Sequence, residues 1–290
     1  MAQTPAQPRR PFSPWLFTVQ LIGQFALLLV AMRFLTPSIW DRQVGAGVGA
    51  FVLVFLGVHL FICFFEWAFH RYVLHSVVSS WLTRFARGHR NHHALTNIQL
   101  KSNDAGPGRI VLNRYPIVDE DQHEDSAFPV YALAAFWVLF TPLLIGLQLL
   151  LPNAPVYLGG YAAITWSMAA YELFHSIEHL PYPWWKRATE HHRFGKLWRK
   201  VYGFHHFHHA NVGSNEAISG FFGLPLADWV FRTYHQPQDL LLHGRIATAK
   251  EFAVRPPWPF VAWLDRWARA REAKIRRSGA EVGEPVRIES

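Results

Sequence analysis

Histidine is concentrated in four short segments of this 290-residue chain. Eleven of the seventeen histidines lie in these segments, which read EWAFHRYVLH, GHRNHH, YELFHSIEH and GFHHFHHA, and ten of the eleven form four spaced groups. A neutral imidazole offers a nitrogen lone pair that binds zinc, copper, iron or nickel. Spacings of three and four residues place side chains on one face of a helix, so the last three segments can each point their histidines the same way. The ten candidate metal ligands are His70, His75, His89, His92, His93, His175, His179, His205, His208 and His209.

The number of candidate ligands indicates two metal ions. A structural zinc site uses four ligands and commonly includes cysteine, so ten histidines exceed the needs of one such site. His70 and His75 are five residues apart, which puts them about 140° apart on an ideal helix, so they converge only if the helix bends or ends there. A tag-like or solvated tract is the alternative for GFHHFHHA alone, but this run lies between apolar segments and three similar clusters precede it.

The rest of the composition is typical of a membrane protein. Hydrophobic residues make up 51% of the chain and charged residues only 17%, against roughly 25% charged residues in soluble domains. Four apolar stretches have the length of about twenty residues that spans a bilayer. These predicted spans cover residues 15–34, 44–65, 128–151 and 156–174. The single cysteine, Cys63, lies in the second span and cannot form an internal disulfide.

Basic residues predict the orientation of these spans. Residues 66–127 hold seven arginines and lysines, whereas the two short links, 35–43 and 152–155, hold only Arg42. By the positive-inside rule, both termini and all four histidine segments face the cytoplasm. The net charge of +8 is explained by topology and contacts with anionic lipid, so we expect no nucleic-acid partner. The prediction is an all-α integral membrane protein of about four transmembrane helices, with a helical cytoplasmic cap that carries a histidine-rich dimetal site.

The domain organisation follows from these spans. We expect an N-terminal tail over residues 1–14 without a cleavable signal sequence, a membrane-embedded domain over 15–258, and a disordered tail over 278–290. Residues 259–277 place tryptophans and aliphatic residues at helical spacing, with arginines between them. This pattern favours an amphipathic helix at the membrane interface, although a helix packed on the cytoplasmic domain fits equally well.

The series HxxxxH, HxxHH, HxxxH and HxxHH on four spans resembles the membrane-bound di-iron fatty acid hydroxylase and sterol desaturase superfamily. The resemblance covers residues from about 51 to about 234 and implies that all ten histidines are ligands of two iron ions, which zinc can replace during purification. It also implies that O2 oxidises an unactivated C–H bond of a lipid. The implied function is hydroxylation of an acyl chain or lipid, with hydroxylation or desaturation of a sterol or carotenoid as the alternative in the same superfamily.

The implied reaction needs electrons from another protein. The chain has no flavin or nicotinamide fingerprint and no set of cysteines for an iron–sulfur centre. We therefore expect a membrane lipid as substrate and a separate electron donor, such as a reductase, a ferredoxin or a cytochrome b5-like carrier. The insert of residues 94–127 either caps the site, meets this donor or is a solvated loop.

Other polar residues near the clusters have expected supporting roles. Glu66 precedes His70 by four residues, shares its helix face and is expected to orient its imidazole. The resemblance also marks Asp228, in the segment that follows the last histidine cluster. The remaining neighbours either support the ligands or are ordinary interfacial histidines, which is the interpretation we favour; they are His191, His192 and His206.

Two other classes of protein fit parts of the pattern. The segment HSIEH, residues 175–179, matches the HxxEH pattern of zinc metalloproteases, in which Glu178 would be the general base. That interpretation leaves eight clustered histidines unexplained. A metal transporter or haem-binding membrane protein is the second alternative, but transport sites commonly lie near the bilayer midplane, whereas these histidines gather at one surface.

Overall fold

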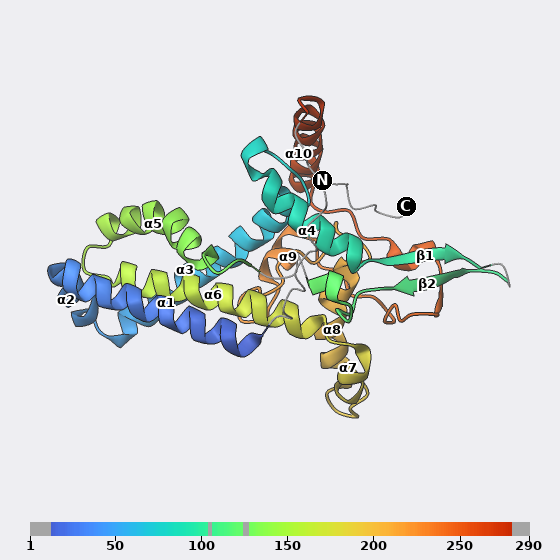
Figure 1. Cartoon of the computed structure of the whole chain (residues 1–290), viewed down its shortest axis with the longest axis horizontal. Helices are drawn as coiled ribbons and strands as arrows, with labels where there is room; N and C mark the ends of the chain where they lie inside the picture. The colour runs from blue at the N-terminus through green and yellow to red at the C-terminus, as the bar shows by residue number, and fades with distance from the viewer. Residues whose placement is uncertain (1–12, 104–105, 124–127, 280–290) are drawn as a thin grey trace, which may run out of the picture.

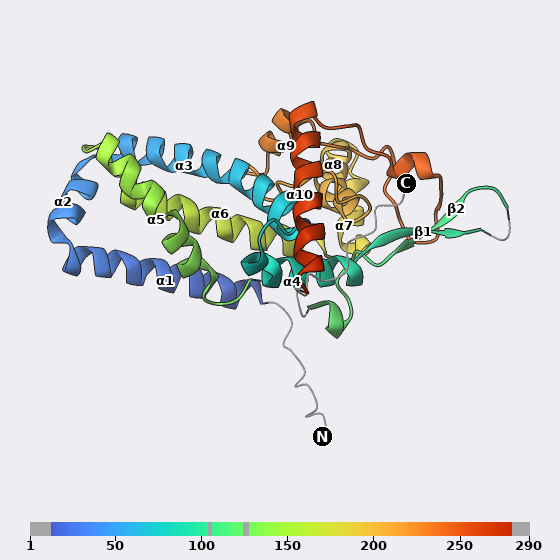
Figure 2. The same cartoon turned by 90° about the horizontal axis from the view of Figure 1, so that it is seen from above.

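The structure is a computed structural model that describes residues 13–103, 106–123 and 128–279. Within these residues it is mostly helical, with ten α-helices. Four long helices extend toward one end of the molecule, where the short helix α2 (Pro37–Gly45) also lies, and the other elements form a cap at the opposite end (Figures 1 and 2). The long helices are α1 (Pro14–Leu35), α3 (Val48–Phe69), α5 (Ala132–Leu150) and α6 (Val156–Glu178). The predicted tails, 1–14 and 278–290, lie almost wholly outside the described residues.

Among the described residues, three segments are long and apolar enough to cross a membrane. They are Pro14–Leu35, Val48–Leu74 and Ala132–Leu150, which correspond to the first three predicted spans. The short helix α2 (Pro37–Gly45) joins the first two of them. The second begins four residues later than predicted, at Val48, after Gly47 adopts a positive φ of 85°.

The fourth predicted span, residues 156–174, is helical in α6 but is not among the three membrane-length apolar helices. Helix α6 packs against α3, α5 and α1. The contact is close: a Cβ added at Gly159 would lie 2.8 Å from Val54 of α3, and one at Gly160 would lie 2.5 Å from Leu144 of α5. A helix enclosed by its neighbours needs less apolar surface than one that faces lipid, which explains the lower hydropathy of α6.

Helix α3 ends in a π-helical turn, η1 (His70–Leu74). The backbone N–H of His75 donates to the carbonyl of His70 at 3.0 Å, the i→i+5 bond that defines such a turn. The wider turn brings residues five apart onto one side, and the ring centroids of His70 and His75 are 4.8 Å apart. This is the change in helix geometry that the spacing of the two histidines required.

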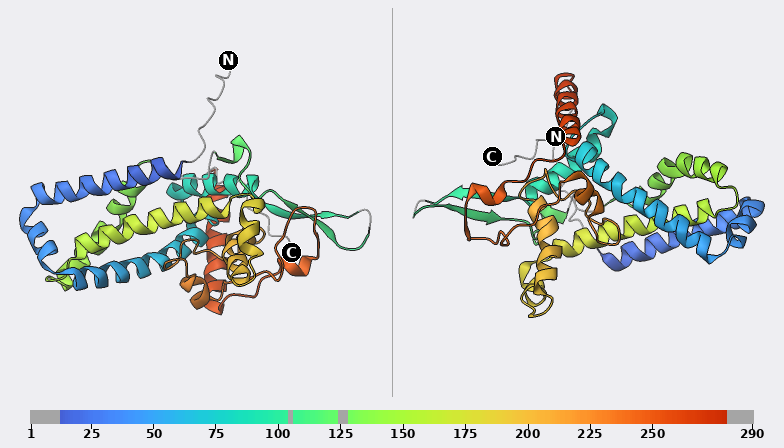
Figure 3. Two further views of the ribbon diagram at one scale, coloured as in Figure 1. Left: turned by 90° about the horizontal axis from the view of Figure 1, so that it is seen from below. Right: turned by 180° about the vertical axis from the view of Figure 1, so that it is seen from behind.

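The cap consists of short helices and a small sheet. Helix α10 lies across the direction of the long helices (Figure 3) and buries Val261, Ala268 and Ile275, while Trp263 and Trp267 are exposed. The α-helices of the cap are α4 (Thr83–Leu95), α7 (Tyr182–Thr189), α8 (Gly195–His208), α9 (Leu226–Phe231) and α10 (Pro259–Arg277). Three 3₁₀ turns complete it: η2 (Ser80–Leu82), η3 (Glu120–His123) and η4 (Ala249–Phe252).

The prediction of an all-α protein was wrong for the insert 94–127. Part of it forms the antiparallel strands β1 (Ile98–Ser102) and β2 (Arg109–Asn113), with Ile98 opposite Asn113. The strand β3 (Ile246–Ala247) pairs with β2 and gives the order β1-β2-β3. Ile98 and Leu100, two residues apart, both face inward and pack with Val111 in one core cluster. Burial of every second residue is typical of a strand.

Candidate metal centre

All ten candidate ligands meet where the long helices join the cap, in two groups. In each group, one ligand atom per histidine can be chosen so that all five lie within 4.8 Å of one another. Each group could therefore hold a metal ion. The first histidine group is His70, His75, His89, His93 and His208, and the second is His92, His175, His179, His205 and His209.

Two helices contribute to both groups. Helix α4 gives His89 and His93 to the first group and His92 to the second. Helix α8 gives His208 to the first group, and it gives His205 to the second together with His209, the residue that caps its C-terminus. Residues four apart share a helix face, whereas adjacent residues point about 100° apart. The expectation that all three histidines of each HxxHH segment point the same way therefore holds only for the i,i+4 pairs. This division places the groups side by side, and the rings of His93 and His209 stack at 4.0 Å.

Nine of the ten histidines approach another member of their group through Nε2. In the first group, His70 and His89 approach to 2.8 Å and His75 and His208 to 2.9 Å. In the second, Nε2 of His205 lies 3.2 Å from that of His179 and 3.1 Å from that of His209. Two nitrogens bound at right angles to one ion, each at about 2.1 Å, are about 3.0 Å apart. The observed separations therefore fit ligands arranged around an ion.

Backbone carbonyls determine which ring nitrogen carries the proton. Nδ1–H of His70 donates to Glu216 O at 2.7 Å, and Nδ1–H of His208 donates to Ser214 O at 2.7 Å. In the second group, Nδ1–H of His179 donates to Tyr115 O at 2.6 Å. These bonds leave Nε2 unprotonated in a neutral ring, with its lone pair toward the group.

Two Nε2 lone pairs of the second group lie within 3.2 Å of one histidine, His205. Nδ1–H of His209 donates to Thr96 O at 3.0 Å, so Nε2 of His209 is a lone pair, as in His179. His205 lies between these two lone pairs and has at most one Nε2 proton to donate. A cation at the centre satisfies every lone pair at once, so the donor set fits a metal ion.

Burial keeps these imidazoles neutral. It lowers the pKa of His179 to about 3 although the bond to Tyr115 opposes the shift, and no more than 3% of the surface of any ligand in the second group is exposed. Burial also lowers the pKa values of seven other ligands that lie outside the membrane-length segments, and nearby histidines lower these pKa values further. They are His75, His89, His92, His93, His205, His208 and His209.

Comparison with known proteins identifies no relative of this chain. No protein-family model, curated protein or solved structure matches this chain significantly. The functional assignment therefore depends on the two histidine groups and on what surrounds them.

Glu66 and Asp228, the two predicted supporting carboxylates, both bind the loop of residues 216–219. Glu66 accepts hydrogen bonds from the backbone N–H of Ser219 at 2.8 Å and from its hydroxyl at 2.6 Å, whereas His70 donates to Glu216. Asp228 accepts bonds from the N–H groups of Glu216 and Ala217, both at 2.9 Å, and so holds the loop that orients His70.

The other three histidines near the clusters belong to neither group. His191 and His192 are exposed and stack on each other at 4.6 Å. His206 is buried, and its Nε2 accepts a hydrogen bond from the N–H of Leu241 at 3.1 Å. His191 and His192 therefore lie at the surface, whereas His206 is buried inside the cap.

Glu178 is not a member of the second histidine group, although it precedes His179. A metalloprotease of the HxxEH type would need this carboxylate beside the metal-bound water. Glu178 instead lines a groove of aromatic residues that includes Trp184 and Trp198. The five histidines of the group also exceed the two that the protease pattern supplies.

Sequence reasoning missed the residues that orient the ligands. Four of the acceptors are backbone carbonyls, of Thr96, Tyr115, Ser214 and Glu216, and the identity of a side chain does not mark them. In the sequence, the charges of Arg71 and Arg90 indicate only the orientation of the membrane spans. In the structure both are buried beside the first histidine group.

Proposed function

We propose that this protein is a membrane-bound di-iron oxidoreductase that uses O2 to hydroxylate an acyl chain or other lipid. The observation that supports this proposal best is the pair of adjoining five-histidine groups at the end of membrane-length helices. A single structural zinc site does not need two such groups. The resemblance of the four histidine segments to the fatty acid hydroxylase and sterol desaturase superfamily agrees with this geometry.

Iron is the proposed metal because the reaction is an oxidation. Imidazole binds several divalent metals, and zinc has no redox chemistry. Two bound irons would supply the activation of O2 that oxidation of an unactivated C–H bond requires. The chain contributes the ten imidazoles and holds the Nδ1 protons of His70, His179, His208 and His209 on backbone carbonyls.

An apolar cavity of about 70 Å³ joins the first histidine group to the long helices. His70 and Glu66 line one part of it, and the side chains of Phe140, Ile164 and Met168 line the rest. Such a lining excludes water and binds hydrocarbon. This position suits a methylene segment of a lipid whose C–H bond must come close to the metal centre.

The proposed orientation places the cap and both termini in the cytoplasm. Arginines and lysines of the segments outside the long helices support it through the positive-inside rule. A soluble or membrane-anchored electron donor would then reach the cap directly. We propose α6 as a fourth span, enclosed by α1, α3 and α5.

Lipid mass spectrometry tests the proposal. Purified protein loaded with iron is incubated in vesicles with lipid, O2 and a chemical or enzymatic reductant. A gain of one oxygen atom identifies hydroxylation, and a loss of two hydrogens identifies the alternative of desaturation. Protein with two bound irons that leaves a broad set of acyl, sterol and carotenoid lipids unchanged would refute the proposed activity.

A further inference from the structure

Helix α10 contacts the first histidine group through two arginines. Asp265 of α10 binds Arg71 of the π-helical turn, with Nε–Oδ1 and Nη2–Oδ2 distances of 2.8 and 2.7 Å. About two turns further along α10, Glu272 binds Arg90 of α4, with Nη1–Oε1 and Nη2–Oε2 distances of 2.9 and 2.6 Å. Each pair is a two-point contact, which fixes the guanidinium plane as well as its position.

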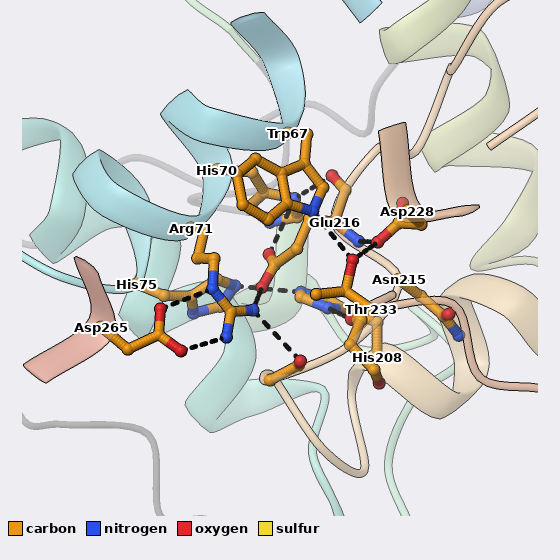
Figure 4. Close-up of polar contacts among 12 residues, drawn as sticks. Trp67, His70, Arg71, His75, His208, Asn215, Glu216, Asp228, Thr233 and Asp265 are labelled. Carbon is orange, nitrogen blue, oxygen red and sulfur yellow. Dashed lines mark hydrogen bonds and ion pairs between the residues drawn. The ribbon is translucent and has the colours of Figure 1, made fainter. Parts of the chain in front are cut away.

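Arg71 connects α10 to the loop that orients two ligands. Its Nη1 donates to Gly213 O at 3.1 Å and to Glu216 Oε1 at 2.8 Å. Ser214 and Glu216 of this loop provide the carbonyls that accept from His208 and His70. Figure 4 shows Arg71 between Asp265 on one side and Glu216 on the other, with His70 beside them.

Arg90 connects α10 to a third ligand of the same group. Its Nη2 donates to the carbonyl of His75 at 2.7 Å. Glu272 also accepts the backbone N–H of Val77 at 3.1 Å, two residues after that ligand. Arg90 itself follows His89 in α4. The carboxylates of α10 therefore fix the backbone around His75 and the helix that carries His89.

The ligands of the second histidine group depend on a different segment. His179 donates to Tyr115 O and His209 to Thr96 O. Thr96 and Tyr115 flank the hairpin β1–β2 on either side. The two groups are therefore held by different parts of the cap.

Charge gives α10 a second effect on the first group. Arg71 and Arg90 are buried cations next to a site that would hold a divalent cation, and like charges repel strongly where water is excluded. Asp265 and Glu272 neutralise them. Without these carboxylates, both arginines would lose their two-point contacts with α10, although Arg71 would keep its contact with Glu216. Their less compensated charges would lower the affinity of the first group for a cation.

We propose that α10 holds the first histidine group in its metal-binding geometry, and that Asp265 and Glu272 are positioning residues whose loss weakens metal binding at that group alone. The inference depends on the proposed metal centre. Residues that orient metal ligands commonly change metal affinity by about 10- to 100-fold when replaced. Affinity at the second group is expected to stay within twofold of wild type.

Metal content separates this role from a general loss of stability. We would purify full-length Asp265→Asn and Glu272→Gln in detergent, load them with Fe(II), and dialyse against a chelator that leaves two ions in the wild type. The expected result is a fall from two ions per chain to one. Glu251→Gln is the matched control, because Glu251 pairs with Arg245 elsewhere in the cap and its loss should leave two ions.

Double variants assign the lost ion to one group. His93→Ala added to Asp265→Asn should cause no further loss, since both changes affect the first group. His179→Ala added to Asp265→Asn should remove the remaining ion. A wild type with fewer than two ions would refute the proposed centre itself. A two-ion wild type whose α10 variants keep both ions, or lose both together, would refute the role of α10 alone.

Discussion

Thr96 offers a test of how the second histidine group is held. Its side chain is fully buried, and its hydroxyl donates to His92 O at 2.6 Å and accepts from Nδ1 of His209 at 3.0 Å. Thr96→Val keeps the shape of the side chain and removes both bonds. Each is worth about 1 kcal/mol net, so the free energy of unfolding should fall by about 2 kcal/mol.

The effect of Thr96→Val on metal binding should be moderate. His209 keeps its second acceptor, the Thr96 carbonyl at 3.0 Å, so its ring can stay in place. We therefore expect a weakening at the lower end of the range for residues that orient ligands, about tenfold in the dissociation constant of one ion. Competition with a chromophoric chelator measures that constant, and thermal unfolding measures the loss of stability.

Thr141→Val provides the control for this prediction. The Thr141 hydroxyl donates to Trp137 O at 2.7 Å and bonds to the Tyr161 hydroxyl at 2.8 Å, within the long helices. The number of lost hydrogen bonds is the same, so a similar loss of stability should leave both metal affinities unchanged. The reasoning would be refuted if Thr96→Val bound both ions like the wild type, or if Thr141→Val weakened an ion equally.

Three further predictions concern the ligands and their protons. His92→Ala and His208→Ala should each lose lipid oxidation and at least one iron per chain while still inserting into membranes. His243→Ala should change neither activity nor iron content, because His243 is exposed and accepts a hydrogen bond from the N–H of Asn113. Activity retained by either ligand variant would contradict the assignment. Removing the metal with a chelator should lower the unfolding temperature, and Fe(II) at about 100 times its dissociation constant should restore about 2.7 kcal/mol per site; calorimetry with and without Fe(II) measures this. The metal-free protein should lose stability as the pH falls below about 6.5. Histidines of the unfolded chain take up protons there, whereas buried His179 has a pKa of about 3 in the folded protein. An unfolding temperature that is constant from pH 8 to 5.5 would show that the histidines are not buried in neutral form.

The histidine positions could be predicted because their spacing is a local property of the sequence. Pairs four apart, such as His89 and His93, share a helix face and do lie in one group. The division of neighbours between groups could not be predicted. His92 and His93 belong to different groups because α4 runs between both, and that placement depends on the packing of four distant segments.

Other parts of the structure differ from the sequence-based expectations for physical reasons. The fourth predicted span, α6, is less apolar than a lipid-facing helix because other helices enclose it, with Gly159 and Gly160 in close contact with α3 and α5. The strands β1 and β2 have five residues each, too short for their alternation to stand out from a loop. Glu66 shares a helix face with His70, yet Ser219 reaches its carboxylate.

Helix α10 shows how a correct boundary can leave a role undetermined. The predicted helix 259–277 coincides with α10. Its arginines and tryptophans favoured the membrane interface, and that placement stays a prediction. Its two inward carboxylates, Asp265 and Glu272, bind arginines that lie far away in the sequence. Only the folded chain brings these charges together.

Anomalous diffraction at the iron edge tests the central claim most directly. Crystals of protein purified with Fe(II) should give two strong anomalous peaks, one enclosed by His70, His75, His89, His93 and His208 and the other by His92, His175, His179, His205 and His209. Data collected just below the edge should show both peaks greatly reduced. A single peak, peaks outside these groups, or a signal that persists below the iron edge would contradict a di-iron centre.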